Sequence, residues 1–123
     1  MLSDKFALGA LSLFVVASAA PAALESKSAP TVTVCIDSIN PPNGCVTIPF
    51  SSDSCITFTG GLSAWNKQVS NAQIPEGFIC TFFETTNCVE NGDAGQVSLP
   101  PGTQDFFTAG FNDQASSFLC SAL

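Results

Sequence analysis

Short runs of β-branched and aromatic residues, separated by turn-forming residues, recur along the chain from residue 31 onward. The run TVTVCI occupies residues 31–36, and the turn-forming sequences PPNG at 41–44 and SSD at 51–53 follow it. Runs of this composition predict β-strands. Proline and glycine interrupt every window that could hold a regular helix, so we expect at most one-turn helices, at 62–66 or 105–109. The pattern predicts an all-β sandwich or barrel, with strands at residues 31–36, 45–48, 55–58, 78–84, 96–99 and 103–107. Residues 110–120 are expected to form a tight polar loop that leads into a further, half-buried strand.

The first 30 residues do not share this pattern. A polar start containing Lys5 precedes an apolar or small-residue run at 6–16 and the small residues at 17–19. That order is typical of a cleaved secretory signal, here residues 1–19. The alternative is an uncleaved anchor, but the run is shorter than the about 20 residues that span a bilayer, and Pro21 follows it. We expect residues 20–30 to form a flexible leader or pro-segment, and residues 31–123 to form a secreted, extracellular domain without a membrane anchor.

The cysteine content agrees with export. An even number of cysteines in a small exported domain predicts three disulfides, and six cysteines allow 15 connectivities. The alternative, a zinc site, lacks both histidine and a Cys-x-x-Cys pair. All six cysteines follow the signal: Cys35, Cys45, Cys55, Cys80, Cys88 and Cys120.

The charge balance narrows the range of partners. Removal of Asp4 and Lys5 with the signal leaves two of three lysines, no arginine and nine of ten carboxylates, so the formal net charge stays at −7. Phosphate recognition depends on lysine and arginine, so nucleic acid and anionic membranes are disfavoured. Calcium, neutral carbohydrate or a basic protein suit an acidic surface.

An internal repeat divides the domain. Residues 64–72 (AWNKQVSNA) align with residues 110–118 (GFNDQASSF), matching aromatic to aromatic, Asn to Asn, Gln to Gln and Ser to Ser. With a repeat of about 45 residues, Cys35 also falls on Cys80, and Cys45 lies near Cys88. A repeat of about 45 residues predicts two similar motifs packed on each other, with motif one at about residues 31–75 and motif two at about 76–123.

The repeated motif resembles that of the βγ-crystallin family. Its members close each unit with Asn/Asp-Asn/Asp-x-x-Ser/Thr-Ser, which residues 112–117 fit at every defined position, and the sequence FFE at 82–84 followed by Gly92 is similar to the family's folded hairpin. The cysteine-rich, exported character resembles small βγ-crystallin-like proteins of fungi. Three positions depart from the family pattern: Cys88 replaces an aromatic residue, and Lys67 and Asn71 stand in the first loop. The resemblance implies a disulfide-stabilised sandwich of two tandem Greek-key motifs.

The resemblance also implies calcium sites at the loops that close the two motifs. Calcium prefers hard oxygen ligands, and we expect Asp113, Gln114 and Ser116, with Ser70 of the first loop, to supply them. A main-chain carbonyl near Glu84 would add another. Lys67 would place an ammonium near one ion, and at about 4 Å and an effective dielectric of about 20 unit charges repel by about 4 kcal/mol. We therefore expect at most one site, of weak affinity.

A purely structural role for the same loop residues is the alternative. Asn and Ser side chains stabilise such turns by hydrogen bonds to the main chain, and we assign this role to Asn112 and Ser117. For Asp113 and Ser116, both metal binding and turn formation stay open.

The chain contains no histidine, which excludes Ser-His-acid and Cys-His catalysis. Paired carboxylates could in principle act as in glycosidases, but these carboxylates lie in turn-rich or strand-edge sequence. We therefore do not expect an enzyme. Trp65 should be buried like Phe111, and the other aromatic residues should pack in the core. The carboxylates concerned are Glu76, Glu84, Glu90, Asp93 and Asp105, and the core candidates are Phe58, Phe78, Phe82, Phe83, Phe106, Phe107, Phe111 and Phe118.

These observations favour a secreted, monomeric, non-enzymatic structural or binding protein with one weak calcium site. Its protein or carbohydrate partner is not specified by the sequence. The alternative is an antimicrobial, killer-toxin-like or effector protein that acts on a foreign cell or protein. The acidic charge counts against a membrane-acting toxin but not against binding to a protein target.

Overall fold

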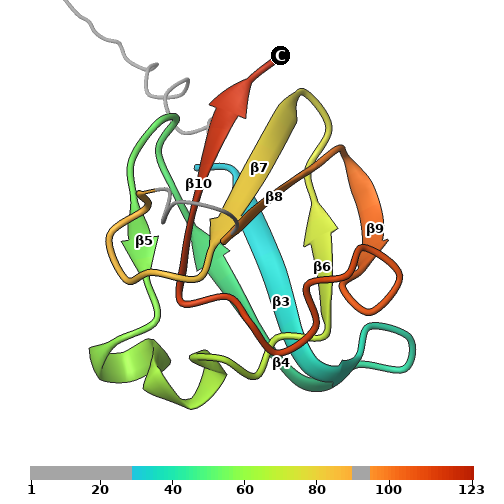
Figure 1. Cartoon of the computed structure of the whole chain (residues 1–123). Coiled ribbons are helices and arrows are strands. Elements are labelled where there is room, and N and C mark those ends of the chain that lie inside the picture. The colour runs from blue at the N-terminus through green and yellow to red at the C-terminus, as the bar shows by residue number, and fades with distance from the viewer. Residues whose placement is uncertain (1–28, 90–94) are drawn as a thin grey trace, which may run out of the picture.

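The computed structural model describes residues 29–89 and 95–123, which form two four-stranded antiparallel sheets (Figure 1). The expected signal, residues 1–19, lies outside the described residues, as does most of the leader. The first half of the domain contains β3 (Thr31–Ser38), β4 (Asn43–Pro49), β5 (Ile56–Thr57), the 3₁₀ helix η3 (Gly60–Trp65) and β6 (Asn71–Ile74). The second half contains β7 (Phe78–Phe83), β8 (Gln96–Leu99), β9 (Gly102–Asp105) and β10 (Ser117–Ala122). The prediction of an all-β fold is confirmed.

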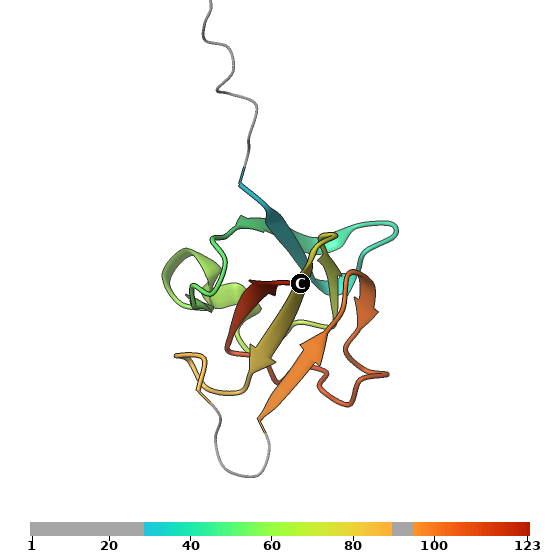
Figure 2. The ribbon, with the colours of Figure 1, turned by 90° about the horizontal axis from the view of Figure 1, so that it is seen from above.

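The two halves exchange their third strands. One sheet has the order β5-β10-β7-β8 and the other the order β4-β3-β6-β9. Each sheet therefore takes three strands from one half and one from the other, in matching positions. Seen from above, β10, β7 and β8 lie on one side of the domain and β3, β6 and β9 on the other (Figure 2). This is the predicted pair of Greek-key motifs, and neither half completes its sheet alone.

The core lies between the sheets and follows from the alternation of residues along each strand. In β3, Val32 and Val34 are fully buried while Thr31 is exposed, as expected for a strand with one face on the core. The ring of Phe82 in β7 packs against that of Phe106, which follows β9 in the other sheet, at a centroid distance of 4.8 Å, and against Phe118 at 5.0 Å. The Phe82–Phe106 contact joins the two sheets, whereas Phe82 and Phe118 face each other on neighbouring strands of one sheet.

Two aromatic residues differ from expectation. Phe107 is 77 % exposed, so its assignment to the core was wrong. The carboxylate of Asp105 accepts hydrogen bonds from the main-chain N–H of Phe107 at 2.9 Å and from the Thr108 hydroxyl at 3.1 Å, and this tight turn directs the ring outward. Trp65 is half-buried rather than buried like Phe111, and its indole N–H donates to the carbonyl of Gly44 at 2.9 Å.

All six cysteines form disulfides, as predicted, and the structure supplies the connectivity. Cys35–Cys45 joins β3 to β4 and Cys80–Cys120 joins β7 to β10, each between residues that face each other across neighbouring strands. Cys55–Cys88 joins the segment before β5 to the segment after β7. This third bridge connects the two halves of the domain.

The strand register corrects part of the repeat alignment. In the sheets Cys35 faces Asn71, and Phe83 faces Ser117. Since Asn71 and Ser117 are equivalent in the loop alignment, the counterpart of Cys35 is Phe83 rather than Cys80. The predicted match of Cys35 with Cys80 was therefore wrong, because the segments between the first strand and the closing loop differ in length between the halves.

Candidate cation sites at the crossed loops

Two loops that precede β6 and β10 cross each other at the bottom of Figure 1. We call residues 66–71 and 112–117 the crossed loops. The main-chain N–H of Lys67 donates to the carbonyl of Ala115 at 2.8 Å, and that of Asp113 donates to the carbonyl of Val69 at 3.1 Å. The exchange is reciprocal, so Lys67 and Asp113 occupy equivalent positions. Both have left-handed backbones, with φ of 60° and 61°.

The neighbouring residues follow the same two-fold relation. Ser70 donates its N–H to the carbonyl of Cys35 at 2.9 Å, and Ser116 donates to that of Phe83 at 2.7 Å. The carbonyls of Ser70 and Ser116 in turn accept from Phe106 at 2.9 Å and from Phe58 at 3.0 Å, the residues that follow the exchanged strands β9 and β5. The crossed loops therefore hold both exchanged strands in place.

Ser117 and Asn71 each bond to the chain near the end of the first strand of a half, which is β7 for Ser117 and β3 for Asn71. Ser117 is fully buried, and its hydroxyl donates to the carbonyl of Thr85 at 2.6 Å and accepts from the N–H of Cys88 at 3.0 Å. The amide of Asn71 donates to the carbonyl of Asp37 at 2.8 Å. Ser117 thus has the structural role that we expected, and Asn71 replaces the family's serine with an equivalent hydrogen bond.

The ammonium of Lys67 donates hydrogen bonds to two main-chain carbonyls in the second half of the domain. Its Nζ donates to the carbonyl of Glu84 at 2.8 Å and to that of Gln114 at 3.0 Å. Gln114, and a carbonyl near Glu84, are the groups from which calcium ligands were expected. An ammonium at hydrogen-bond distance from both oxygens repels a divalent cation, so this donor set does not fit calcium while Lys67 is in place.

The position equivalent to Lys67 lies in the second half and carries the opposite charge. By the two-fold relation, Asp113 corresponds to Lys67, Gln68 to Gln114, and Ser70 to Ser116. The carbonyl of Ile36 corresponds to that of Glu84, because Ile36 follows Cys35 as Glu84 follows Phe83. The first-half donor set is therefore one carboxylate, two carbonyls and one hydroxyl, a combination of oxygens that suits calcium.

The structure thus divides the predicted ligands between two places. The ammonium of Lys67 bonds to the carbonyl of Gln114, and the two-fold relation would assign Ser116 to the same set and Asp113 and Ser70 to the first-half set. Sequence reasoning missed Gln68 and Ile36, whose carbonyls complete that set. The repeat contained the signal for Gln68, which aligns with Gln114, but Ile36 could be found only from the strand register. That calcium binds at Asp113 stays a prediction.

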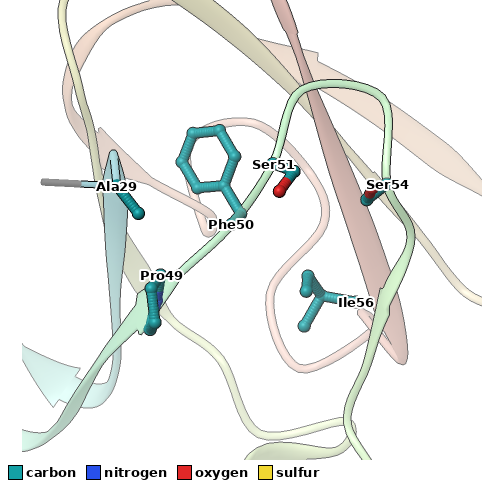
Figure 3. A pocket seen from close by; sticks show the side chains of 6 residues that line it. All are labelled: Ala29, Pro49, Phe50, Ser51, Ser54 and Ile56. Atoms are coloured by element: carbon teal, nitrogen blue, oxygen red, sulfur yellow. The ribbon is translucent and has the colours of Figure 1, made fainter. Parts of the chain in front are cut away.

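Two surface pockets are prominent, and Asn71, at the end of one crossed loop, lines the second of them. One, of about 270 Å³, is shown in Figure 3 and is lined by Ala29, Pro49, Phe50, Ser51, Ser54 and Ile56. The other, of about 590 Å³, is lined by Ser38, Ile39, Asn40, Asn71, Gln73 and Thr103. Both linings are neutral, so neither brings together the two carboxylates that a glycosidase-like mechanism needs. The amides and hydroxyls of the second pocket suit an uncharged, hydroxylated ligand.

Of the five carboxylates considered for catalysis, Glu76, Glu84 and Asp105 lie in the described residues. Both oxygens of Asp105 accept hydrogen bonds within its own turn, while Glu90 and Asp93 lie outside the described residues, as does Gly92. Within residues 29–89 and 95–123, no three acidic, cysteine or histidine side chains gather as a metal-binding group. A calcium site among these residues would therefore need carbonyl or hydroxyl oxygens besides carboxylates. No helix in the described ranges is long and apolar enough to cross a membrane.

Two interleaved Greek-key motifs closed by reciprocal polar loops define the βγ-crystallin fold. A solved structure described as "Evolution of the eye lens beta-gamma-crystallin domain fold" is similar to this chain, with a TM-score of 0.60 over 81% of this chain and 94% of that chain. Its sequence identity is 16%, so the likeness concerns the fold. No protein-family model and no curated protein matches the chain.

Proposed function

We propose that the chain is a secreted, disulfide-stapled βγ-crystallin-like module with a structural or binding role, without catalytic activity and with one weak calcium site at Asp113. The observation that carries the calcium proposal is the asymmetry between the crossed loops. Lys67 and Asp113 occupy equivalent positions. Lys67, in the first half, places its ammonium on two carbonyls of the second half, whereas Asp113, in the second half, carries a carboxylate. The fold supports a structural or binding role without catalysis. The three disulfides and the signal-like sequence of residues 1–19 support secretion.

The expected affinity follows from the donor set. One carboxylate, from Asp113, supplies the only negative charge, and the carbonyls of Gln68 and Ile36 and the hydroxyl of Ser70 are neutral. Affinity for calcium falls with the charge of the ligands, and extracellular modules bind it with dissociation constants of about 10⁻⁴ to 10⁻³ M. We expect the first-half site to lie in this range, which suits calcium-rich extracellular fluid.

Calorimetric titration of the mature protein with calcium tests the proposal. We expect one ion for each chain, and we expect Asp113→Ala to abolish binding. Glu76→Ala is the matched control, since it removes an exposed carboxylate from the turn between β6 and β7 and should leave binding unchanged. Circular dichroism would check that both variants fold. Binding that Asp113→Ala leaves unchanged, or a wild type that binds no calcium at millimolar concentration, would contradict the proposal.

A role as an effector that binds a foreign protein is the second candidate. The exposed ring of Phe107, held outward by the turn at Asp105, favours it, because aromatic anchors dominate many protein interfaces. A growth-inhibition assay with purified protein, repeated with Phe107→Ala, would test this role. Inhibition that the substitution removes would support it, and the absence of inhibition would leave the structural or binding role.

A further inference from the structure

The side chain of Lys67 reaches from the first half of the domain into the second. Its Nζ donates to the main-chain carbonyls of Glu84 and Gln114, at 2.8 and 3.0 Å. Glu84 directly follows β7, and Gln114 lies in the loop that leads into β10. Because both acceptors belong to the main chain, the fold itself fixes where the positive charge lies.

The ammonium of Lys67 bonds to carbonyl oxygens and not to carboxylates. Lys67 is the only lysine or arginine in the part of the chain that the structure describes, and the chain as a whole has a formal net charge of −7. Carboxylates are plentiful on such a surface, yet both of these hydrogen bonds go to neutral carbonyl oxygens. Carbonyl oxygens from a hairpin and a loop are ligands of the kind that calcium takes. The ammonium, a compact charge with three donors, can satisfy the same oxygens without a metal.

The backbone gives a second, independent observation. A left-handed conformation is unfavourable for residues that carry a Cβ atom, and Asp tolerates it better than Lys. Lys67 nevertheless has the φ of 60° that Asp113 has at the equivalent position, where φ is 61°. A lysine is therefore held in a conformation suited to Asp or Asn. The same residue makes both side-chain hydrogen bonds to the second half.

We propose that the ammonium of Lys67 is a built-in replacement for a metal ion, which fastens the segment after β7 to the loop before β10 without calcium. The second-half donor set is then closed to metal in the wild type, while its carbonyl oxygens keep the arrangement of a cation site. The inference takes the location of the paired sites from the proposed function, but it does not depend on whether Asp113 binds calcium. Replacing Lys67 by a carboxylate should open a site that the native chain does not have.

The test is a calcium titration of Lys67→Asp, alone and combined with Asp113→Ala. Lys67→Asp should bind one more ion per chain than the wild type, and the double variant one more than Asp113→Ala alone. The double variant separates the two proposals, because failure of the Asp113 site leaves its predicted gain unchanged. A folded Lys67→Asp protein that binds no additional calcium, in either background, would overturn the inference.

Lys67→Met is the control, because it keeps most of the side-chain volume but removes the charge. It should gain no ion, and its melting temperature should fall by about 5 °C whether or not calcium is present. The melting temperature of Lys67→Asp should fall in chelator and recover in millimolar calcium. If Lys67→Asp folds only when calcium is present, that dependence supports the inference. A Lys67→Met protein that melts with the wild type would show that the ammonium fastens nothing and would overturn it.

Discussion

Removal of the Cys55–Cys88 bridge should cost more stability than its exposed position suggests. The bridge closes a loop with a sequence separation of 33 residues. In the chain-entropy model, cross-linking a loop of this length lowers the entropy of the unfolded chain by about 12.5 cal/mol/K, or about 3.7 kcal/mol at 25 °C. Cys55 is exposed and Cys88 half-buried, so replacing both by alanine removes little core packing. The loss should therefore come mainly from the unfolded state.

The assay is urea unfolding of the double variant Cys55→Ala/Cys88→Ala, followed by tryptophan fluorescence and circular dichroism. We expect the free energy of unfolding to fall by about 3 to 4 kcal/mol. The Cys35–Cys45 bridge closes a separation of only 10 residues, for which the same model gives about 2.7 kcal/mol. The comparison variant is Cys35→Val/Cys45→Ala. Valine is used at position 35 because Cys35 is fully buried and alanine would leave a cavity there. A loss below about 1 kcal/mol for Cys55→Ala/Cys88→Ala would refute the reasoning, because it would mean that the bridge does not constrain the unfolded chain.

Three further substitutions test the core and the role of Ser117. Phe82→Ala should lower the free energy of unfolding by about 3 to 5 kcal/mol, because its fully buried ring contacts Phe106 and Phe118. Phe107→Ala, the matched control, should change it by less than about 0.5 kcal/mol; equal effects would contradict the assigned core. Ser117→Ala should cost about 1 to 3 kcal/mol, because it leaves buried main-chain groups without their partner. Chemical denaturation measures all three, and a Ser117→Ala protein as stable as wild type would exclude its hairpin role.

The fold could be predicted because its signals are local. Alternation of buried and exposed residues in segments such as 31–36, with turn sequences between them, places the strands without knowledge of their partners. The match of residues 64–72 with residues 110–118 identified the crossed loops, and the structure makes them equivalent by reciprocal hydrogen bonds. Lys67 was recognised in advance as a charge that would oppose an ion, and its ammonium lies on the expected carbonyl of Gln114.

The remaining features depend on contacts between distant residues. The predicted ligand set combined Asp113, Gln114 and Ser116 of one loop with Ser70 of the other, but the loops cross, so the side chain that bonds to the carbonyl of Gln114 is that of Lys67. Cys80 pairs with Cys120 rather than following the repeat, because pairing depends on which residues face each other across strands. Phe107 lies within an apolar pair, and only the hydrogen bonds to Asp105 show that its ring turns outward.

A crystal structure of the wild-type protein at saturating calcium would test the central claim most directly. We expect one calcium ion at the first-half set, coordinated by the carboxylate of Asp113, and the ammonium of Lys67 still bonded to the carbonyls of Glu84 and Gln114. Calcium bound at Gln114 with the Lys67 side chain displaced into solvent would contradict the account.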